Sequence, residues 1–114
     1  KGFDTFCPLG PCIVTHRGID EAADLSLVTS VDGEVKQDAN TNQMVYSIAE
    51  LIAYVSAFAT LLPGDVLLTG TPAGVGPLLA GQRVSVEIDG IGTLTNPVVD
   101  DTDDLEDADS VAAK

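Results

Sequence analysis

The chain has 114 residues, of which 18 are acidic and 5 basic, so its formal net charge is −13, and 45% of its residues are hydrophobic. A chain of this length forms one domain at most, and its hydrophobic content excludes disorder throughout. Because so strong a negative charge repels phosphate groups, we expect neither nucleic acid nor a membrane surface as a partner.

The chain opens with a predicted rigid turn, Cys-Pro-Leu-Gly-Pro-Cys at 7–12, followed by a β-prone run at 13–15. Its prolines fix φ and its glycine permits a positive φ. Cys7, Cys12 and His16 have a spacing that invites a zinc site, but the set is one ligand short and the sequence holds no other Cys or His. We interpret the cysteines as small, buried or partly buried thiols, reduced as in a cytoplasmic protein.

Two β-hairpins are predicted, each around an Asp-Gly pair. The first covers residues 25–37 with its turn at 32–33, and the second covers residues 83–95 with its turn at 89–90. Asp-Gly between two alternating β-prone runs is typical of a two-residue type I′ turn. The alternation in each hairpin predicts that one face is buried.

One helix is predicted, over residues 47–62. Ser47 and Glu50 have the spacing of a capping box, and apolar residues recur every three or four positions after them. An apolar run at 66–69 predicts a fully buried strand, which leads into a Gly-rich and Pro-rich loop at 70–77. No apolar run approaches the roughly 20 residues of a membrane span, so we expect a soluble chain.

Two features are candidates for binding an anion. The loop at 70–77 lacks the phosphate-loop spacing, but it can expose the backbone N–H and hydroxyl of Thr71 to one carboxylate oxygen; a plain tight connection is the alternative. Lys1 stands at the head of the rigid turn, where a lysine can bind an anionic substrate or can simply be solvated.

These elements predict an α+β, β-rich domain with one packed helix. Its strands leave edges that so short a body cannot easily cover, which indicates a larger sheet. The domain is expected to span 1–99. Residues 100–114 carry seven of the 18 carboxylates and are expected to form a disordered acidic tail.

Three long motifs, at 1–11, 61–76 and 88–98, resemble the C-terminal half of the fumarylacetoacetate hydrolase family. The resemblance implies a mixed β-sandwich roll that is incomplete in this chain, assembled as a homodimer. It also implies Mg²⁺ or Mn²⁺ and small 2-oxo acid substrates that react through an enolate. The activities it implies are oxaloacetate decarboxylase, acylpyruvate hydrolase and 2-hydroxyhepta-2,4-diene-1,7-dioate isomerase; the first and last match best.

By the same resemblance, Lys1 contacts the substrate's oxygens, and Gly70 and Thr71 hold a substrate carboxylate. The metal ligands and the acid/base pair of the family precede the motif at Lys1, and no residue of this sequence matches them. We therefore expect an N-terminal half as a partner, with no metal ligands in this chain and no activity of this chain alone. The alternative is a truncated, noncatalytic paralogue that serves as a binding or assembly partner.

Overall fold

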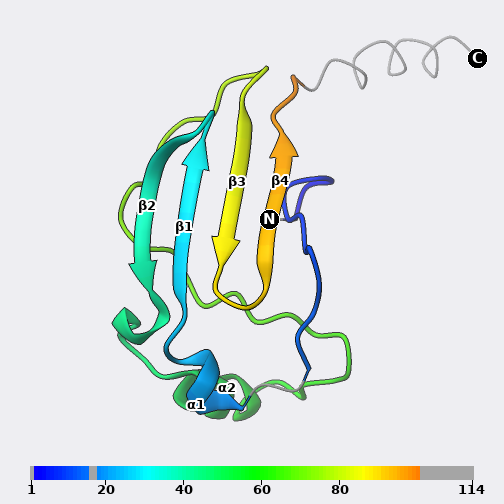
Figure 1. Cartoon of the computed structure of the whole chain (residues 1–114). Coiled ribbons are helices and arrows are strands. Elements are labelled where there is room, and N and C mark those ends of the chain that lie inside the picture. The colour runs from blue at the N-terminus through cyan, green and yellow to red at the C-terminus, as the bar shows by residue number, and fades with distance from the viewer. Residues whose placement is uncertain (1, 16–17, 101–114) are drawn as a thin grey trace, which may run out of the picture.

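The computed structural model describes residues 2–15 and 18–100. One antiparallel sheet, with the strand order β2-β1-β3-β4, dominates it, and the helices lie beyond one end of the sheet (Figure 1). This arrangement confirms the predicted α+β class. In chain order the elements are α1 (Ile19–Ala22), β1 (Ser26–Val31), β2 (Glu34–Asn40), the 3₁₀ turn η1 (Thr41–Gln43), α2 (Ile48–Ser56), β3 (Arg83–Ile88) and β4 (Gly92–Pro97).

The first hairpin forms as predicted. Asp32 and Gly33 both have a positive φ, 51° and 84°, as a type I′ turn requires. The side chain of Asp32 also accepts a hydrogen bond from the backbone N–H of Arg83 at 2.8 Å, which ties this turn to the start of β3. Further along β2 the pairing slips, because Thr29 faces Gln37 whereas the next residue of β1 faces Val35. This slip is a β-bulge.

The second hairpin has a longer turn than predicted. Ile88 pairs with Gly92, so three residues make the turn instead of the Asp-Gly pair alone. Gly90 adopts a positive φ of 67°, but Asp89 does not, so the type I′ conformation is not adopted. The backbone N–H of Ile91 closes the turn on the carbonyl of Ile88 at 3.0 Å.

Helix α2 begins where the capping box predicts and ends earlier than expected. The hydroxyl of Ser47 accepts from the backbone N–H of Glu50 at 3.2 Å, and the Glu50 carboxylate accepts from the backbone N–H of Ser47 at 2.7 Å. The helix ends at Ser56 rather than at residue 62. Bonds between residues three apart, such as Phe58 N–H to the carbonyl of Val55 at 3.2 Å, tighten the turn that follows.

The prediction of a buried strand at 66–69 is wrong. Val66, Leu67 and Leu68 are 59%, 37% and 50% exposed, and no strand in the described part of the chain pairs with them. Without a neighbouring strand the run has neither ladder bonds nor cover. The β-prone run at 13–15 likewise forms no strand.

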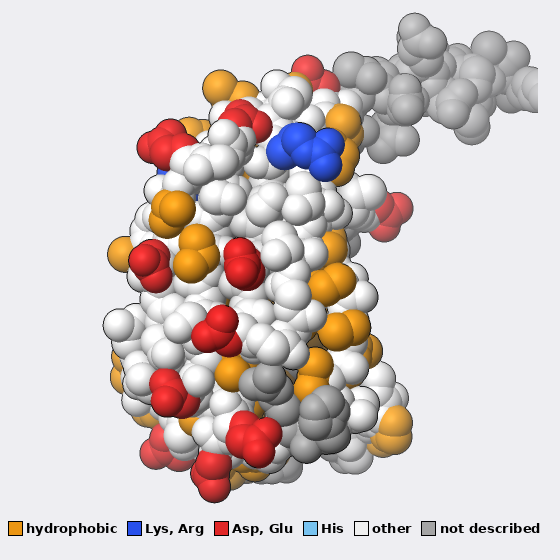
Figure 2. All heavy atoms as spheres, viewed as in Figure 1, with side chains coloured by type: hydrophobic (Ala, Val, Ile, Leu, Met, Phe, Trp, Pro, Cys, Tyr) orange, Lys and Arg blue, Asp and Glu red, His pale blue; other side chains and the backbone are white. Residues whose placement is uncertain are grey.

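Few side chains are buried. Among the described residues only the hydrophobic side chains of Leu25 and Val31 are, and no polar side chain is. In Figure 2, acidic side chains are spread over the visible face, and hydrophobic side chains reach the surface along its right side and again toward the upper left. The described residues therefore do not close a core of their own. None of the helices in these residues is long and apolar enough to cross a membrane.

The side chain of Thr41, which follows β2 directly, connects the end of this strand to the segment between α1 and β1. The hydroxyl of Thr41 accepts from the backbone N–H of Leu25 at 2.8 Å and donates to the carbonyl of Ala22 at 2.9 Å. Neither α1 nor η1 was predicted, because both are too short for an apolar period to show.

Candidate functional site

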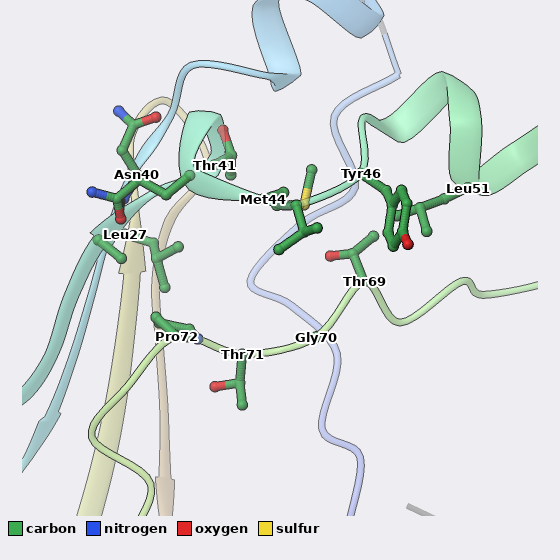
Figure 3. A pocket seen from close by; sticks show the side chains of 13 residues that line it. Leu27, Asn40, Thr41, Met44, Tyr46, Leu51, Thr69, Gly70, Thr71 and Pro72 are labelled. Atoms are coloured by element: carbon green, nitrogen blue, oxygen red, sulfur yellow. Dashed lines mark hydrogen bonds between the residues drawn. The ribbon is translucent and has the colours of Figure 1, made fainter.

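The loop of residues 69–72 lies between two hollows, and Gly70 and Thr71 line both of them. The smaller hollow has a volume of about 290 Å³ and the larger one about 870 Å³. Figure 3 shows Thr69 directed toward Met44, whereas Thr71 points to the opposite side of the loop. The side chains of Thr69 and Thr71 therefore leave the loop on opposite sides.

The smaller hollow is mostly apolar. Leu27 of β1, Leu51 of α2 and two residues of the connection between η1 and α2, Met44 and Tyr46, form much of its wall (Figure 3). Asn40, at the end of β2, adds a polar group. Such a wall suits the carbon skeleton of a small organic ligand more than an inorganic ion.

On the other side of the loop, the side chain of Gln37 in β2 forms two hydrogen bonds to it. The amide Nε2 of Gln37 donates to the hydroxyl oxygen of Thr71 at 2.9 Å and to the carbonyl of Pro72 at 3.0 Å. These two bonds join positions more than 30 residues apart in the sequence. Gln37 thus fixes the loop to the sheet next to the predicted anion-binding residue.

Gly74 makes a second close approach to β2. It has a φ of +103°, and a Cβ built on it would lie 1.9 Å from the carbonyl oxygen of Lys36. Only glycine fits this position without movement of the loop or the strand. Lys36 is the residue that the β-bulge leaves without a partner on β1.

The remaining candidate residues are not brought into this site. Lys1 and His16 lie outside the described residues. Cys7 and Cys12 are free and exposed, so the expectation of buried or partly buried thiols is wrong. Both belong to the segment before α1, which Figure 1 shows beside β4, at the sheet edge opposite β2.

A metal ion does not fit the groups that the structure describes. Over residues 2–15 and 18–100, no three His, Cys, Asp or Glu side chains come together in an arrangement that could hold one. Glu50 has a lowered pKa, chiefly because its carboxylate accepts from the backbone N–H of Ser47 and secondarily from the Ser47 hydroxyl. That role is a helix cap, so Glu50 is not a candidate ligand.

The sequence indicated Gly70 and Thr71 as candidate residues, but it did not indicate that Gln37, Met44 or Tyr46 would lie beside them. Gln37 carries no local signal, since a polar residue on a hairpin strand is ordinary. Its role depends on where a distant loop comes to lie.

The fold is that of a β-rich α+β domain whose Gly70-Thr71 loop lines two hollows beside the sheet. A family model, "Fumarylacetoacetate (FAA) hydrolase C-terminal", matches residues 1–99. The chain therefore belongs to the fumarylacetoacetate hydrolase family, as its motifs predicted.

Among the relatives of the chain, the mitochondrial oxaloacetate tautomerase FAHD2A of Bos taurus is 49% identical over 106 residues, covering 87% of this chain and 34% of that protein. The crystal structure of 2-hydroxyhepta-2,4-diene-1,7-dioate isomerase from Mycobacterium marinum matches with a TM-score of 0.81 and 57% identity, over 87% of this chain and 38% of the other. Maleylpyruvate hydrolase from Sphingobium sp. SYK-6, in complex with manganese(II) and pyruvate, matches with a TM-score of 0.80 and 43% identity, over 85% and 37%. The chain thus spans little more than a third of the length of these relatives.

Proposed function

We propose that the chain supplies the substrate-carboxylate site of an enzyme that acts on 2-oxo acids through an enolate. The observation that carries the proposal is the exposed Gly70-Thr71 loop between two hollows, in a chain of this family. Relatives named for oxaloacetate tautomerisation, diene-dioate isomerisation and maleylpyruvate hydrolysis support it, because each name denotes chemistry next to a 2-oxo or 2-hydroxy acid.

In this proposal Thr71 binds one oxygen of the substrate carboxylate through its hydroxyl and backbone N–H. Hydrogen bonds to a carboxylate are charge-assisted and stronger than those between neutral groups. Gly70, with a φ of +112° and no side chain, leaves the approach to this N–H open. Lys1 is proposed to contact the substrate's oxygens, where its charge stabilises the negative charge of an enolate.

We also propose a divalent ion, Mg²⁺ or Mn²⁺, whose ligands come from outside this chain. A relative whose structure holds manganese and pyruvate supports this. Because no three potential ligand side chains come together among the described residues, these residues are assigned no step at the metal. Their part is to bind and orient the acid.

The experiment uses the complete product of the reading frame that encodes these residues, called here the complete gene product. It is assayed with Mg²⁺ or Mn²⁺ for oxaloacetate tautomerisation and decarboxylation, acylpyruvate hydrolysis and diene-dioate isomerisation. We expect turnover on at least one substrate, and loss of that turnover with a chelator. No turnover on any of them would favour the alternative, a noncatalytic paralogue that binds or assembles.

Residues 1–114 expressed alone are expected to be inactive. Twenty large hydrophobic side chains among the described residues are exposed, which supports the proposal that a further part of the catalytic domain and a second copy of the protein cover them. Enzyme-like turnover by residues 1–114 alone would refute the first half of this proposal. A monomeric mass for the complete gene product in light scattering would refute the second.

A further inference from the structure

We propose that Gln37 is a positioning residue that sets the direction in which the Thr71 hydroxyl donates its proton. This inference deepens the carboxylate site and rests on the proposed function. Gln37 belongs to β2, and its side-chain amide forms two hydrogen bonds to the loop. It is not proposed to contact the substrate.

The identity of the amide atom follows from its partners. A carbonyl oxygen can only accept, so the amide atom 3.0 Å from the carbonyl of Pro72 must be the NH₂ nitrogen of Gln37. The same nitrogen lies 2.9 Å from the hydroxyl oxygen of Thr71. This nitrogen carries two protons, enough to donate one to each partner.

This arrangement decides the polarity of the Thr71 hydroxyl. Since its oxygen accepts from Gln37, its own proton is directed elsewhere. The hydroxyl makes no other hydrogen bond within residues 2–15 and 18–100. That proton is thus available to a carboxylate oxygen, and the bond to Gln37 makes the hydroxyl a better donor because hydrogen bonds in a chain polarise one another.

The β-bulge places Gln37 in position to do this. Lys36 is the extra residue of β2, and beyond it the strand is re-aimed, as bulges near binding sites commonly do. The carbonyl of Lys36 meets Gly74 while the next side chain, Gln37, meets Thr71 and Pro72. Two consecutive residues of β2 therefore hold both ends of the 71–74 segment.

The test compares variants of the complete gene product by their KM for the 2-oxo acid it turns over and by their dissociation constant for pyruvate in calorimetry. Gln37→Met keeps the length of the side chain and removes both bonds, so KM and the dissociation constant should rise about 10-fold with a smaller change in kcat. Gln37→Glu should be worse than Gln37→Met. Its carboxylate accepts the Thr71 proton that the substrate needs, and it places a negative charge beside the substrate anion.

Thr71→Val and the double variant separate positioning from general damage. If Gln37 acts through Thr71, adding Gln37→Met to Thr71→Val raises KM no further than Thr71→Val alone. Asn42→Leu is the control, because it removes a side-chain amide hydrogen bond of 3.1 Å, to the carboxylate of Asp24, at a residue that lines neither hollow. Thermal unfolding of each variant checks its folding.

The two proposals fail in different ways. If Thr71→Val leaves KM and pyruvate binding unchanged, both the carboxylate site and the role of Gln37 are wrong. If Thr71→Val weakens binding but the Gln37 variants do not, or if the two effects simply add, the inference about Gln37 alone is wrong. Equal losses in Gln37→Glu and Gln37→Met would also overturn it, because they would indicate packing without polarity.

Discussion

Gly74→Ala should displace the loop from β2, because the added methyl group has no room beside the strand. The new Cβ would lie 1.9 Å from the carbonyl oxygen of Lys36, whereas real Cβ contacts essentially never fall below 3.0 Å. Loop and strand must therefore separate by about 1.1 Å, which is the difference between these two values. A shift of that size would lengthen the bonds of Gln37 to the loop, now 2.9 and 3.0 Å, beyond hydrogen-bond range.

Two costs combine in this variant, and a second glycine separates them. Placing alanine at a left-handed φ costs about 1–2 kcal/mol. Gly64 has a similar φ of +98° and nothing within 4 Å of an added Cβ, so Gly64→Ala carries the strain without the collision. Gly74→Ala adds the loss of two hydrogen bonds, each worth about 0.5–1.5 kcal/mol.

The assay is the KM of the complete gene product for its 2-oxo acid, together with urea unfolding of both alanine variants. We expect KM to rise about 10-fold or more in Gly74→Ala and to stay within about 2-fold of the parent in Gly64→Ala, given that 1.4 kcal/mol corresponds to a factor of ten. Equal KM values in the two variants would refute the reasoning, because the contact with Lys36 would then have no bearing on the loop.

Further changes test the local structure. Ser47→Ala should destabilise the protein by about 1 kcal/mol in urea unfolding, because the helix cap is lost. In the same variant, NMR titration should find that the pKa of Glu50 rises only part of the way to its ordinary value of 4.5, because its chief partner, the backbone N–H at position 47, remains. Because the pKa of Glu50 is lowered in the folded state, its stabilising effect is present above its ordinary pKa of 4.5 and is lost as pH falls through the lower folded value. Glu50→Gln removes the titrating group, so it should destabilise the protein less at pH 2 than at pH 7, and an equal cost at both pH values would contradict this. Thr41→Val leaves two backbone groups without their partner and should cost about 1–3 kcal/mol, while Thr41→Ser should cost little; similar melting temperatures for the two would be the contrary result. Asp32→Ala loses both the bond to the N–H of Arg83 and the tolerance of a positive φ, and should cost about 1–2 kcal/mol, whereas Asp32→Asn, which keeps an acceptor, should melt close to the parent.

The parts of the fold that could be predicted depend on short stretches of sequence. The cap at Ser47 and the turn at 32–33 were right because each is decided by residues within four positions of one another. The turn after β3 was one residue too short in the prediction, because Asp-Gly permits more than one turn and the flanking Gly92 allows the chain to continue. The strand at 66–69 was wrong because strand formation needs a partner, which a hydrophobic run cannot supply by itself.

The candidate site likewise contains residues that a local motif indicates and residues that only the folded chain brings together. Gly70 and Thr71 stood out through their motif, but the hollow beside them needs Met44 and Tyr46, which the chain brings there only after it turns at the end of β2. No period or spacing in the sequence links residues from these separate segments. The contact of Gln37 with the loop could not be predicted for a further reason. A β-bulge changes the direction in which the following side chains point, and a bulge without glycine has no reliable sequence signature.

The bulge also bears on why β2 can be the last strand of the described sheet. An edge strand exposes backbone groups on which another strand can pair, and a bulge covered by a loop blocks this. Here Gly74 lies against the carbonyl of Lys36, and the Gln37 side chain is engaged with Thr71 and Pro72. The contacts that hold the proposed binding loop therefore also cover part of the sheet edge. A variant that releases the loop should then expose this edge, so Gly74→Ala is expected to aggregate more readily than Gly64→Ala when both are held at equal concentration.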